Sequence, residues 1–239
     1  MPNSAVRRRE AHMKKTINSI VFDWNCTLLD DFGAMIECMN LIMAEVGHPP
    51  ITAEFFRTHY DVPFERLYRN FGFKGETLNK VMELDRDFFH RHYEPMAERQ
   101  NLRPGAKDIF LAADAHGVET IILSNHIVDP IKTQLNRLGI HHHFTEVLAY
   151  ADLETQFVDM TKGERLRRHR AQDARHHGEA LIVGDSIEEI EIAHEQNLIS
   201  VAITGGCVSE TRLRAAKPDY VIHSLHELAP IMRERGLIP

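Results

Sequence analysis

Short, continuous apolar runs recur along the chain, and several of them end abruptly at polar residues. Such runs are typical of strands buried on both faces of a parallel sheet, whereas half-exposed strands alternate apolar and polar residues. Stretches with helical periodicity lie between them, which predicts an α/β fold with a doubly wound parallel sheet. The apolar runs cover residues 19–22, 120–123, 180–183, 198–203 and 220–222, and the helical stretches cover 106–115, 127–138, 162–170, 187–195 and 209–215.

The segment 33–100 interrupts this alternation, because it contains helical stretches and no strand-like run. We therefore predict an all-helical cap domain at 33–100, inserted after the first strand of a core domain made of residues 16–32 and 101–239. Residues 1–15 are basic and nearly devoid of apolar side chains, so we expect a solvated leader. The four expected cap helices cover residues 34–46, 52–59, 63–71 and 76–98.

Charge and composition exclude several classes of protein. The 239 residues include 28 Lys and Arg against 35 Asp and Glu, and this net charge of −7 argues against a nucleic-acid partner. No apolar run reaches the roughly 18 residues that a membrane span needs. The three cysteines lie far apart in the sequence, which favours a reduced, cytoplasmic protein without structural disulfides. We expect a monomer or homodimer that acts on a small molecule.

Polar side chains stand where three of the apolar runs end. The carboxyl ends of parallel strands form the ligand-binding edge of a doubly wound sheet, so these side chains are expected to meet there. Two carboxylates at one edge are costly unless a cation lies between them, and Mg²⁺ prefers oxygen ligands. The residues are Asp23 and Asn25, Ser124 and Asn125, and Asp185 and Glu189.

Four short segments resemble the signature motifs of the haloacid dehalogenase-like superfamily. The sequence Asp-Trp-Asn-Cys-Thr-Leu at 23–28 resembles the first motif, D-x-D-x-T, and Leu-Ser-Asn at 123–125 resembles the second. Gly-Asp-Ser-Ile-Glu-Glu at 184–189 resembles the fourth, with Glu in its last acidic place. The third is a lysine between them, for which Lys162 is the candidate. The order and spacing of these four motifs agree with the superfamily pattern over about residues 17–225. The helical insert resembles that of the phosphoglycolate phosphatase-like subgroup.

This resemblance implies a Mg²⁺-dependent hydrolase of small organic phosphate esters. Asp23 would attack phosphorus and form an aspartyl-phosphate, while Ser124, Asn125 and Lys162 would bind the phosphoryl group. Either Arg66 or Arg69 of the cap is expected to contact the leaving group. The implied magnesium ligands are Asp23, Asp185 and the backbone carbonyl of Asn25. Glu189 would either bind the ion directly or contact one of the groups that bind it.

Asn25 departs from the family pattern. The second Asp of the first motif acts as general acid and base in family phosphatases, and a carboxamide cannot exchange a proton usefully near neutral pH. Loss of such a group typically costs about 10²–10⁴-fold in rate. Three hypotheses follow: a slow phosphatase or one that favours good leaving groups, a phosphotransferase, and a phosphometabolite-binding protein without turnover. The retained acids, Ser124 and Lys162 favour the phosphatase. A dehalogenase is less favoured, because its chemistry needs no metal.

Overall fold

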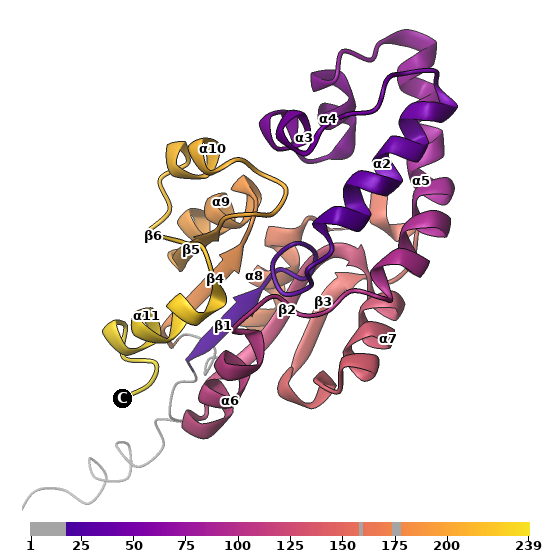
Figure 1. The fold of residues 1–239 in the computed structure, drawn as a ribbon. Coiled ribbons are helices and arrows are strands. Elements are labelled where there is room, and N and C mark those ends of the chain that lie inside the picture. Colours follow the sequence, from indigo (N-terminus) through magenta and orange to yellow (C-terminus); the bar gives the residue numbers. More distant parts are fainter. Residues whose placement is uncertain (1–17, 158–159, 174–177) are drawn as a thin grey trace, which may run out of the picture.

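Six parallel strands form the centre of the protein in the computed structural model, which describes residues 18–157, 160–173 and 178–239 (Figure 1). The expected leader at 1–15 lies outside the described residues. None of the helices in the described ranges combines the length and hydrophobicity that a membrane span requires. The strands are β1 (Ser19–Phe22), β2 (Glu119–Ile127), β3 (Glu146–Tyr150), β4 (Ala180–Gly184), β5 (Ile199–Ile203) and β6 (Tyr220–Ile222).

Strand β1 lies in the interior of the sheet, whose order is β3-β2-β1-β4-β5-β6. Its first residue, Ser19, pairs with Glu119 of β2 on one side and with Ala180 of β4 on the other. The chain builds the sheet outward from β1 to β3 and then crosses back to β4, so the strand order reverses beside β1. Ligands bind outside the carboxyl ends of the strands at such a point. The predicted doubly wound parallel sheet is confirmed.

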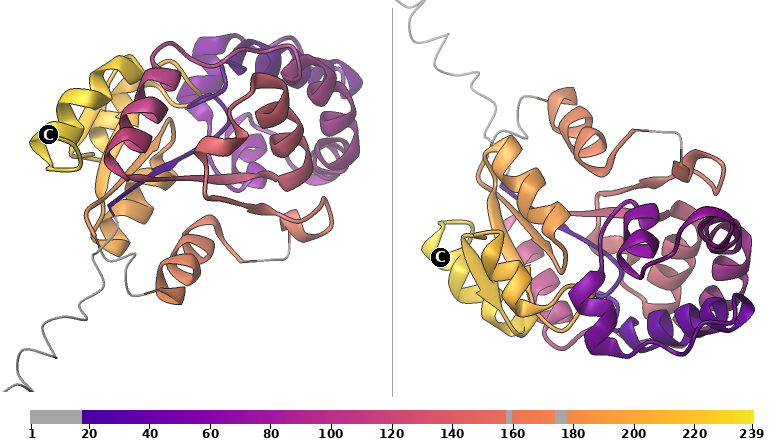
Figure 2. Two further views of the ribbon diagram at one scale, coloured as in Figure 1. Left: turned by 90° about the horizontal axis from the view of Figure 1, so that it is seen from below. Right: turned by 90° about the horizontal axis from the view of Figure 1, so that it is seen from above.

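Helices cover both faces of this sheet (Figure 2). Phe22 packs in one apolar cluster with Phe110 of α6, whereas the preceding Val21 packs in another with Leu166 of α8. Successive side chains of β1 are thus all buried, which explains its continuous apolar sequence. The core helices are α6 (Ala106–His116), α7 (Val128–Leu138), α8 (Lys162–Gln172), α9 (Ile187–Gln196), α10 (Glu210–Ala215) and α11 (Leu228–Glu234), with 3-10 turns at η1 (His141–His143), η2 (Thr155–Phe157) and η4 (Leu225–Glu227).

Four helices lie between β1 and α6 in the chain, as the sequence predicts for the insert. The long helices α2 and α5 pack against each other beyond the carboxyl edge of the sheet, and α4 also packs on α5 (Figure 1). Tyr68 and Phe56 are fully buried among them. The exact division into cap and core remains a prediction. The helices are α2 (Phe32–Glu45), α3 (Ala53–His59), α4 (Phe64–Asn70) and α5 (Gly75–Ala97).

The sequence analysis missed two elements and shortened a third. Strand β3 was not expected, and helix α11 was not assigned. Strand β2 continues past the expected end at Leu123 as far as Ile127, with a break in its register against β3 between these two residues. This irregularity contains Ser124, so the backbone departs from a regular ladder at the place where a candidate site residue stands.

Asp85 of α5 is a buried carboxyl group whose Oδ1 accepts a hydrogen bond from Tyr68 Oη at 2.7 Å. Burial raises the pKa of Asp85 from 3.8 to about 6, and the Tyr68 hydrogen bond and the nearby His90 only partly oppose this. Because the folded-state pKa is the higher one, the protein loses stability as the pH rises from about 4 through about 6.

The substitution Asp85→Asn removes this charge and retains an oxygen acceptor for Tyr68. It should therefore raise the free energy of unfolding by up to about 3 kcal/mol at pH 7, and by little at pH 4 where the carboxyl group is already protonated. Urea denaturation of both proteins at the two pH values measures the difference. An equal gain at pH 4 and pH 7 would contradict an origin in the Asp85 charge.

Candidate active site

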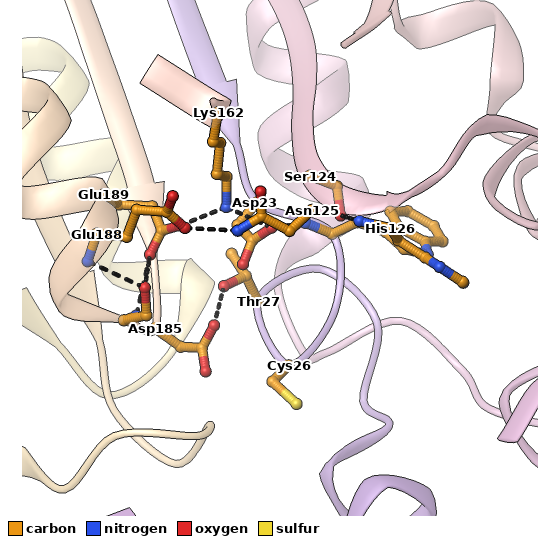
Figure 3. Close-up of polar contacts among 12 residues, drawn as sticks. Asp23, Cys26, Thr27, Ser124, Asn125, His126, Lys162, Asp185, Glu188 and Glu189 are labelled. Atoms are coloured by element: carbon orange, nitrogen blue, oxygen red, sulfur yellow. Dashed lines mark hydrogen bonds and ion pairs between the residues drawn. The ribbon is translucent and has the colours of Figure 1, made fainter. Parts of the chain in front are cut away.

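Polar side chains from four parts of the fold meet at the carboxyl edge of the sheet (Figure 3). Asp23 and Asp185 directly follow β1 and β4, and Ser124 lies within β2. Lys162 is the first residue of α8, and Glu189 lies in the first turn of α9. All five line one cavity of about 340 Å³. The structure therefore brings together the acids, the lysine and the serine that the sequence singles out.

Lys162 lies between two carboxylates. Its Nζ is 3.0 Å from Asp23 Oδ1 and also contacts Glu189 Oε1 (Figure 3). The side chain is only 2% exposed, so it is not a solvated surface lysine. Burial alone would lower the pKa of Lys162, but the two carboxylates outweigh it and raise that pKa above its ordinary value. Lys162 is therefore a fixed positive charge beside Asp23.

Helix capping places Lys162 and Glu189 in the first turns of α8 and α9, at the edge of the cavity. Thr161 caps α8 in a capping box with Glu164, so the helix begins at Lys162. Ser186 caps α9 in the same way with Glu189, whose Oε2 accepts hydrogen bonds from the Ser186 backbone amide at 3.1 Å and from its Oγ at 2.6 Å. Both oxygens of Glu189 are thus engaged, one by Lys162 and one by Ser186.

Asp185 is held by hydrogen bonds from two distant segments. Thr27 Oγ1 donates to its Oδ1 at 3.0 Å, and the Cys207 backbone amide donates to its Oδ2 at 2.5 Å. The backbone of Gly206 passes so close that a Cβ there would lie 2.2 Å from Asp185 Oδ2. The turn after β5 therefore requires glycine at this position in order to hold the carboxylate.

Ser124 and Asn125 lie on the β2 side of the cavity. Ser124 is 1% exposed, and its Oγ accepts a hydrogen bond from the His126 backbone amide at 3.1 Å. Asn125 Nδ2 donates to Glu188 Oε2 at 2.6 Å, which ties the end of β2 to α9. The buried Arg165 donates to the Ser124 carbonyl oxygen at 2.7 Å. The sequence gives no signal for this last contact, because Arg165 belongs to a strongly basic helix that would be expected to face solvent.

The side chain of Asn25 is fixed by two residues that the sequence analysis did not consider. Its Nδ2 donates to Asp31 Oδ2 at 2.9 Å and to Tyr93 Oη of α5 at 2.6 Å. Tyr93 in turn donates to Asp31 Oδ2, and the Cys26 backbone amide donates to Asp31 Oδ1 at 2.6 Å. Asp31 is fully buried. The only signal that the sequence offers is an acid eight residues after the candidate nucleophile Asp23.

The buried carboxylates of this site exceed the positive charge that contacts them. Burial raises the pKa of Asp23 well above its ordinary value, as do the charges of Glu189 and Asp185, while Lys162 opposes the rise. Burial also raises the pKa of Asp185 to about 6, and the charge of Glu189 adds to it. Within the described residues, Lys162 is the one cationic side chain that pairs with any of these acids, and it contacts Asp23 and Glu189. Oxygen donors with excess negative charge suit a hard divalent cation.

The rest of the cavity wall is largely apolar and aromatic, and much of it comes from α5 and the segment around Pro63. Arg66 does not belong to this wall: it is exposed, and its guanidinium donates to the Val62 carbonyl oxygen at 3.4 Å. Helix α4 buries the adjacent Leu67 and Tyr68, which turns Arg66 outward. The structure thus places Arg66 away from the cavity, in contrast to the expected contact with the leaving group. The apolar lining includes Met35, Tyr60, Val62, Pro63, Phe64, Phe89, Tyr93 and Tyr150.

The three cysteines are free and buried in the structure. Two that lie far apart in the sequence nevertheless meet beside the site, with Cys26 Sγ and Cys207 Sγ 3.4 Å apart. The contact with Cys207 raises the pKa of the Cys26 thiol, and burial adds to it. The same contact lowers the pKa of Cys207, but burial outweighs it and the net shift is upward. They serve here as small packing residues next to Asp185.

Comparison with known proteins adds an independent observation. Residues 20–203 match the sequence profile described as haloacid dehalogenase-like hydrolase. The chain is 22% identical over 212 residues to the phosphoglycolate phosphatase of Synechococcus elongatus, covering 89% of this chain and 95% of that protein. It is 24% identical over 226 residues to the phosphoglycolate phosphatase of Vibrio vulnificus strain YJ016, covering 92% and 97%. A solved haloacid dehalogenase-like family protein from Streptococcus pneumoniae has the same fold, with a TM-score of 0.75, 19% identity, and coverage of 90% and 98%.

Proposed function

Because the chain belongs to the haloacid dehalogenase-like hydrolase family, we propose that it is a phosphatase that hydrolyses small organic phosphate monoesters through Asp23. The observation that carries this proposal is the contact of a buried lysine with the carboxylate that ends β1. Lys162 opposes the burial that raises the pKa of Asp23, and the ionised carboxylate is the form that attacks phosphorus. The relatives named phosphoglycolate phosphatase support the same class of substrate.

The two oxygens of Asp23 have different surroundings. Oδ1 accepts a hydrogen bond from the Trp24 backbone amide at 2.8 Å and pairs with Lys162. Oδ2 is then the atom that attacks. Its bond to phosphorus forms while the bond from phosphorus to the ester oxygen breaks, and the leaving alkoxide takes a proton from water. Water next attacks phosphorus and loses a proton to the solvent, and the bond to Oδ2 breaks. Inorganic phosphate leaves, and Asp23 is a free carboxylate again.

The other residues bind and orient the phosphoryl group. Lys162 offsets its negative charge, and the Ser124 hydroxyl donates to one of its oxygens. Glu189 acts through Lys162, which it contacts, and through the start of α9, which it caps. Asn125 completes this wall of the cavity beside Glu188.

We propose Mg²⁺ as the cofactor, held by Asp23, Asp185 and the backbone carbonyl of Asn25. The excess of buried carboxylates over positive charge fits such an ion, and Asp185 oxygens retain lone pairs beyond those that Thr27 and Cys207 use. When bound, the ion supplies positive charge that reduces the repulsion between a carboxylate and a phosphate. A cytoplasmic location and a monomeric or homodimeric state remain predictions.

Removal of the divalent cation should therefore abolish hydrolysis. Chelation by EDTA is expected to lower the rate by at least about 10³-fold, because metal charge stabilisation is worth several kcal/mol. Added Mg²⁺ should restore it in the natural chain and fail to do so in Asp185→Asn. Phosphate release from p-nitrophenyl phosphate provides the measurement. Full activity in EDTA, or normal Mg²⁺ dependence in Asp185→Asn, would contradict the proposed ion site.

A second candidate function rests on Asn25. Its carboxamide is fully occupied as a donor to Asp31 and Tyr93 and offers no proton to a leaving alcohol. A chain with this residue can bind a phosphorylated metabolite without turnover, or pass the phosphoryl group to an acceptor other than water. Phosphate release separates these cases from hydrolysis, because a binder releases none and a transferase delivers the label to the acceptor.

A further inference from the structure

A second group of potential ligands lies on another wall of the same cavity. His90 and Glu94 are one helical turn apart on α5, and His126 lies near the end of β2. One ligand atom from each of these residues lies within 4.8 Å of the other two. Because α5 belongs to the insert and β2 to the sheet, the cluster joins two parts of the fold. Both histidines line the cavity.

The distances within this cluster are slightly shorter than those expected between ligands of one ion. Glu94 Oε1 lies 3.1 Å from His90 Nδ1 and 3.0 Å from His126 Nε2. Ligand atoms held about 2.0–2.2 Å from a tetrahedral ion are roughly 3.3–3.5 Å apart, so a small movement would complete the geometry. His90 is 9% and His126 6% exposed. Glu94 Oε2 is buried without a hydrogen-bond partner among the described residues.

The hydrogen bonds of Gln156 identify which nitrogen of His90 carries a proton. Gln156 Nε2 donates to the Asn125 carbonyl oxygen at 2.8 Å, which fixes the orientation of the amide. Its Oε1 then faces His90 Nε2 at 3.3 Å, so that nitrogen must carry hydrogen. In a neutral ring the remaining nitrogen, Nδ1, therefore points its lone pair at the Glu94 carboxylate. The nitrogen lone pair and the carboxylate repel each other, and a cation between them would remove that repulsion. A ring N–H donated to a carbonyl oxygen is the usual support of a metal-bound histidine.

We propose that His90, Glu94 and His126 bind a divalent transition-metal ion of the zinc class. Two imidazoles and one carboxylate suit Zn²⁺ or a similar ion, whereas Mg²⁺ prefers oxygen ligands alone. Three protein ligands leave one position for water or for an oxygen of a molecule in the cavity. The ion would fasten α5 to β2 beside Ser124. This site is separate from Asp23 and Asp185 and does not depend on the proposed hydrolysis.

A metal-free arrangement is the competing explanation. If His90 is protonated on both nitrogens, it forms an ion pair with Glu94 and needs no metal. That places a positive ring against the ring of His126, with the two centroids 5.3 Å apart in a buried stack. Metal titration distinguishes these explanations, because only the metal site takes up a stoichiometric ion.

The experiment uses the full chain, stripped of metal and supplied with millimolar Mg²⁺ to saturate the Asp23 and Asp185 site. Titration with Co²⁺ should bind one equivalent and give the strong visible absorption of a four- or five-coordinate ion with imidazole ligands. Titration with Zn²⁺ should displace the Co²⁺ and raise the melting temperature. Absence of a stoichiometric Co²⁺ complex would overturn the proposal in favour of the protonated His90 pair.

Four variants locate the site. Loss of a residue that supports a metal ligand costs roughly 10–100-fold in metal affinity, so Gln156→Leu should weaken Zn²⁺ binding by that factor. Glu94→Gln keeps the size of the side chain but removes a ligand, and it should weaken Zn²⁺ binding by more. His92→Ala, on the same helix and outside the cluster, should bind as the natural chain does. Asp23→Asn should also bind normally, so failure of the proposed function leaves this test intact. Unchanged binding in a folded Glu94→Gln protein, checked by circular dichroism, would refute the assignment.

Discussion

Asp23→Asn should reduce the turnover number for p-nitrophenyl phosphate by about 10⁴-fold or more, because removal of a covalent nucleophile eliminates the reaction path that the site is built for. The substitution keeps the size of the side chain and the Oδ1 acceptor for the Trp24 amide, so the fold should persist. It also leaves Lys162 with Glu189 as its remaining carboxylate partner. Steady-state phosphate release, measured with Mg²⁺ present, gives the comparison.

Asp30→Asn provides the matched control, because Asp30 is an exposed acid seven residues along the same segment. It should hydrolyse the substrate as the natural chain does. A phosphate-binding protein without turnover would instead show no release in any of the three chains, while a ligand still raises the melting temperature. Equal activity in Asp23→Asn and the natural chain would eliminate Asp23 as the nucleophile and with it the proposed mechanism.

The sequence predicts the centre of the sheet better than the edge that β3 forms. β1 and β4 are buried on both faces and therefore consist of continuous apolar runs that are easy to recognise. β3 is an edge strand whose first residue, Glu146, is exposed and whose middle is half-buried, so no such run marks it. A strand of this kind is fixed by its pairing with β2, which local sequence does not encode.

The candidate site shows the same contrast between residues that local sequence marks and residues that only packing brings into place. Asp23, Lys162 and Asp185 could be located because each stands at a strand or helix end whose position the pattern of the chain reveals. Arg66 could not be placed, because the face that a short cap helix turns inward depends on its packing partners. The His90 and His126 cluster lies equally beyond sequence reasoning, since the two residues meet only when α5 packs against β2.

The contacts of Asn25 show why a single substitution is expected to restore little general acid activity. Asn25→Asp would place a carboxylate where Nδ2 now lies 2.9 Å from Asp31 Oδ2. Two buried carboxylates at that separation share one proton, and the shared proton is held by the pair rather than given to a leaving group. Tyr93, which donates to Asp31, would also be drawn between the two acids.

The double substitution Asn25→Asp with Asp31→Asn exchanges the amide and the carboxyl group and keeps a hydrogen bond between the two positions. It should raise the turnover number for an alkyl phosphate by about 10²–10⁴-fold, the usual worth of a general acid. The gain should be much smaller for p-nitrophenyl phosphate, whose leaving group needs no proton. Asn25→Asp alone should gain less, and Asp31→Asn alone should gain nothing. If the double variant improves both substrates equally or neither, proton transfer at position 25 is not what limits this chain, and the slow-phosphatase hypothesis loses its physical basis.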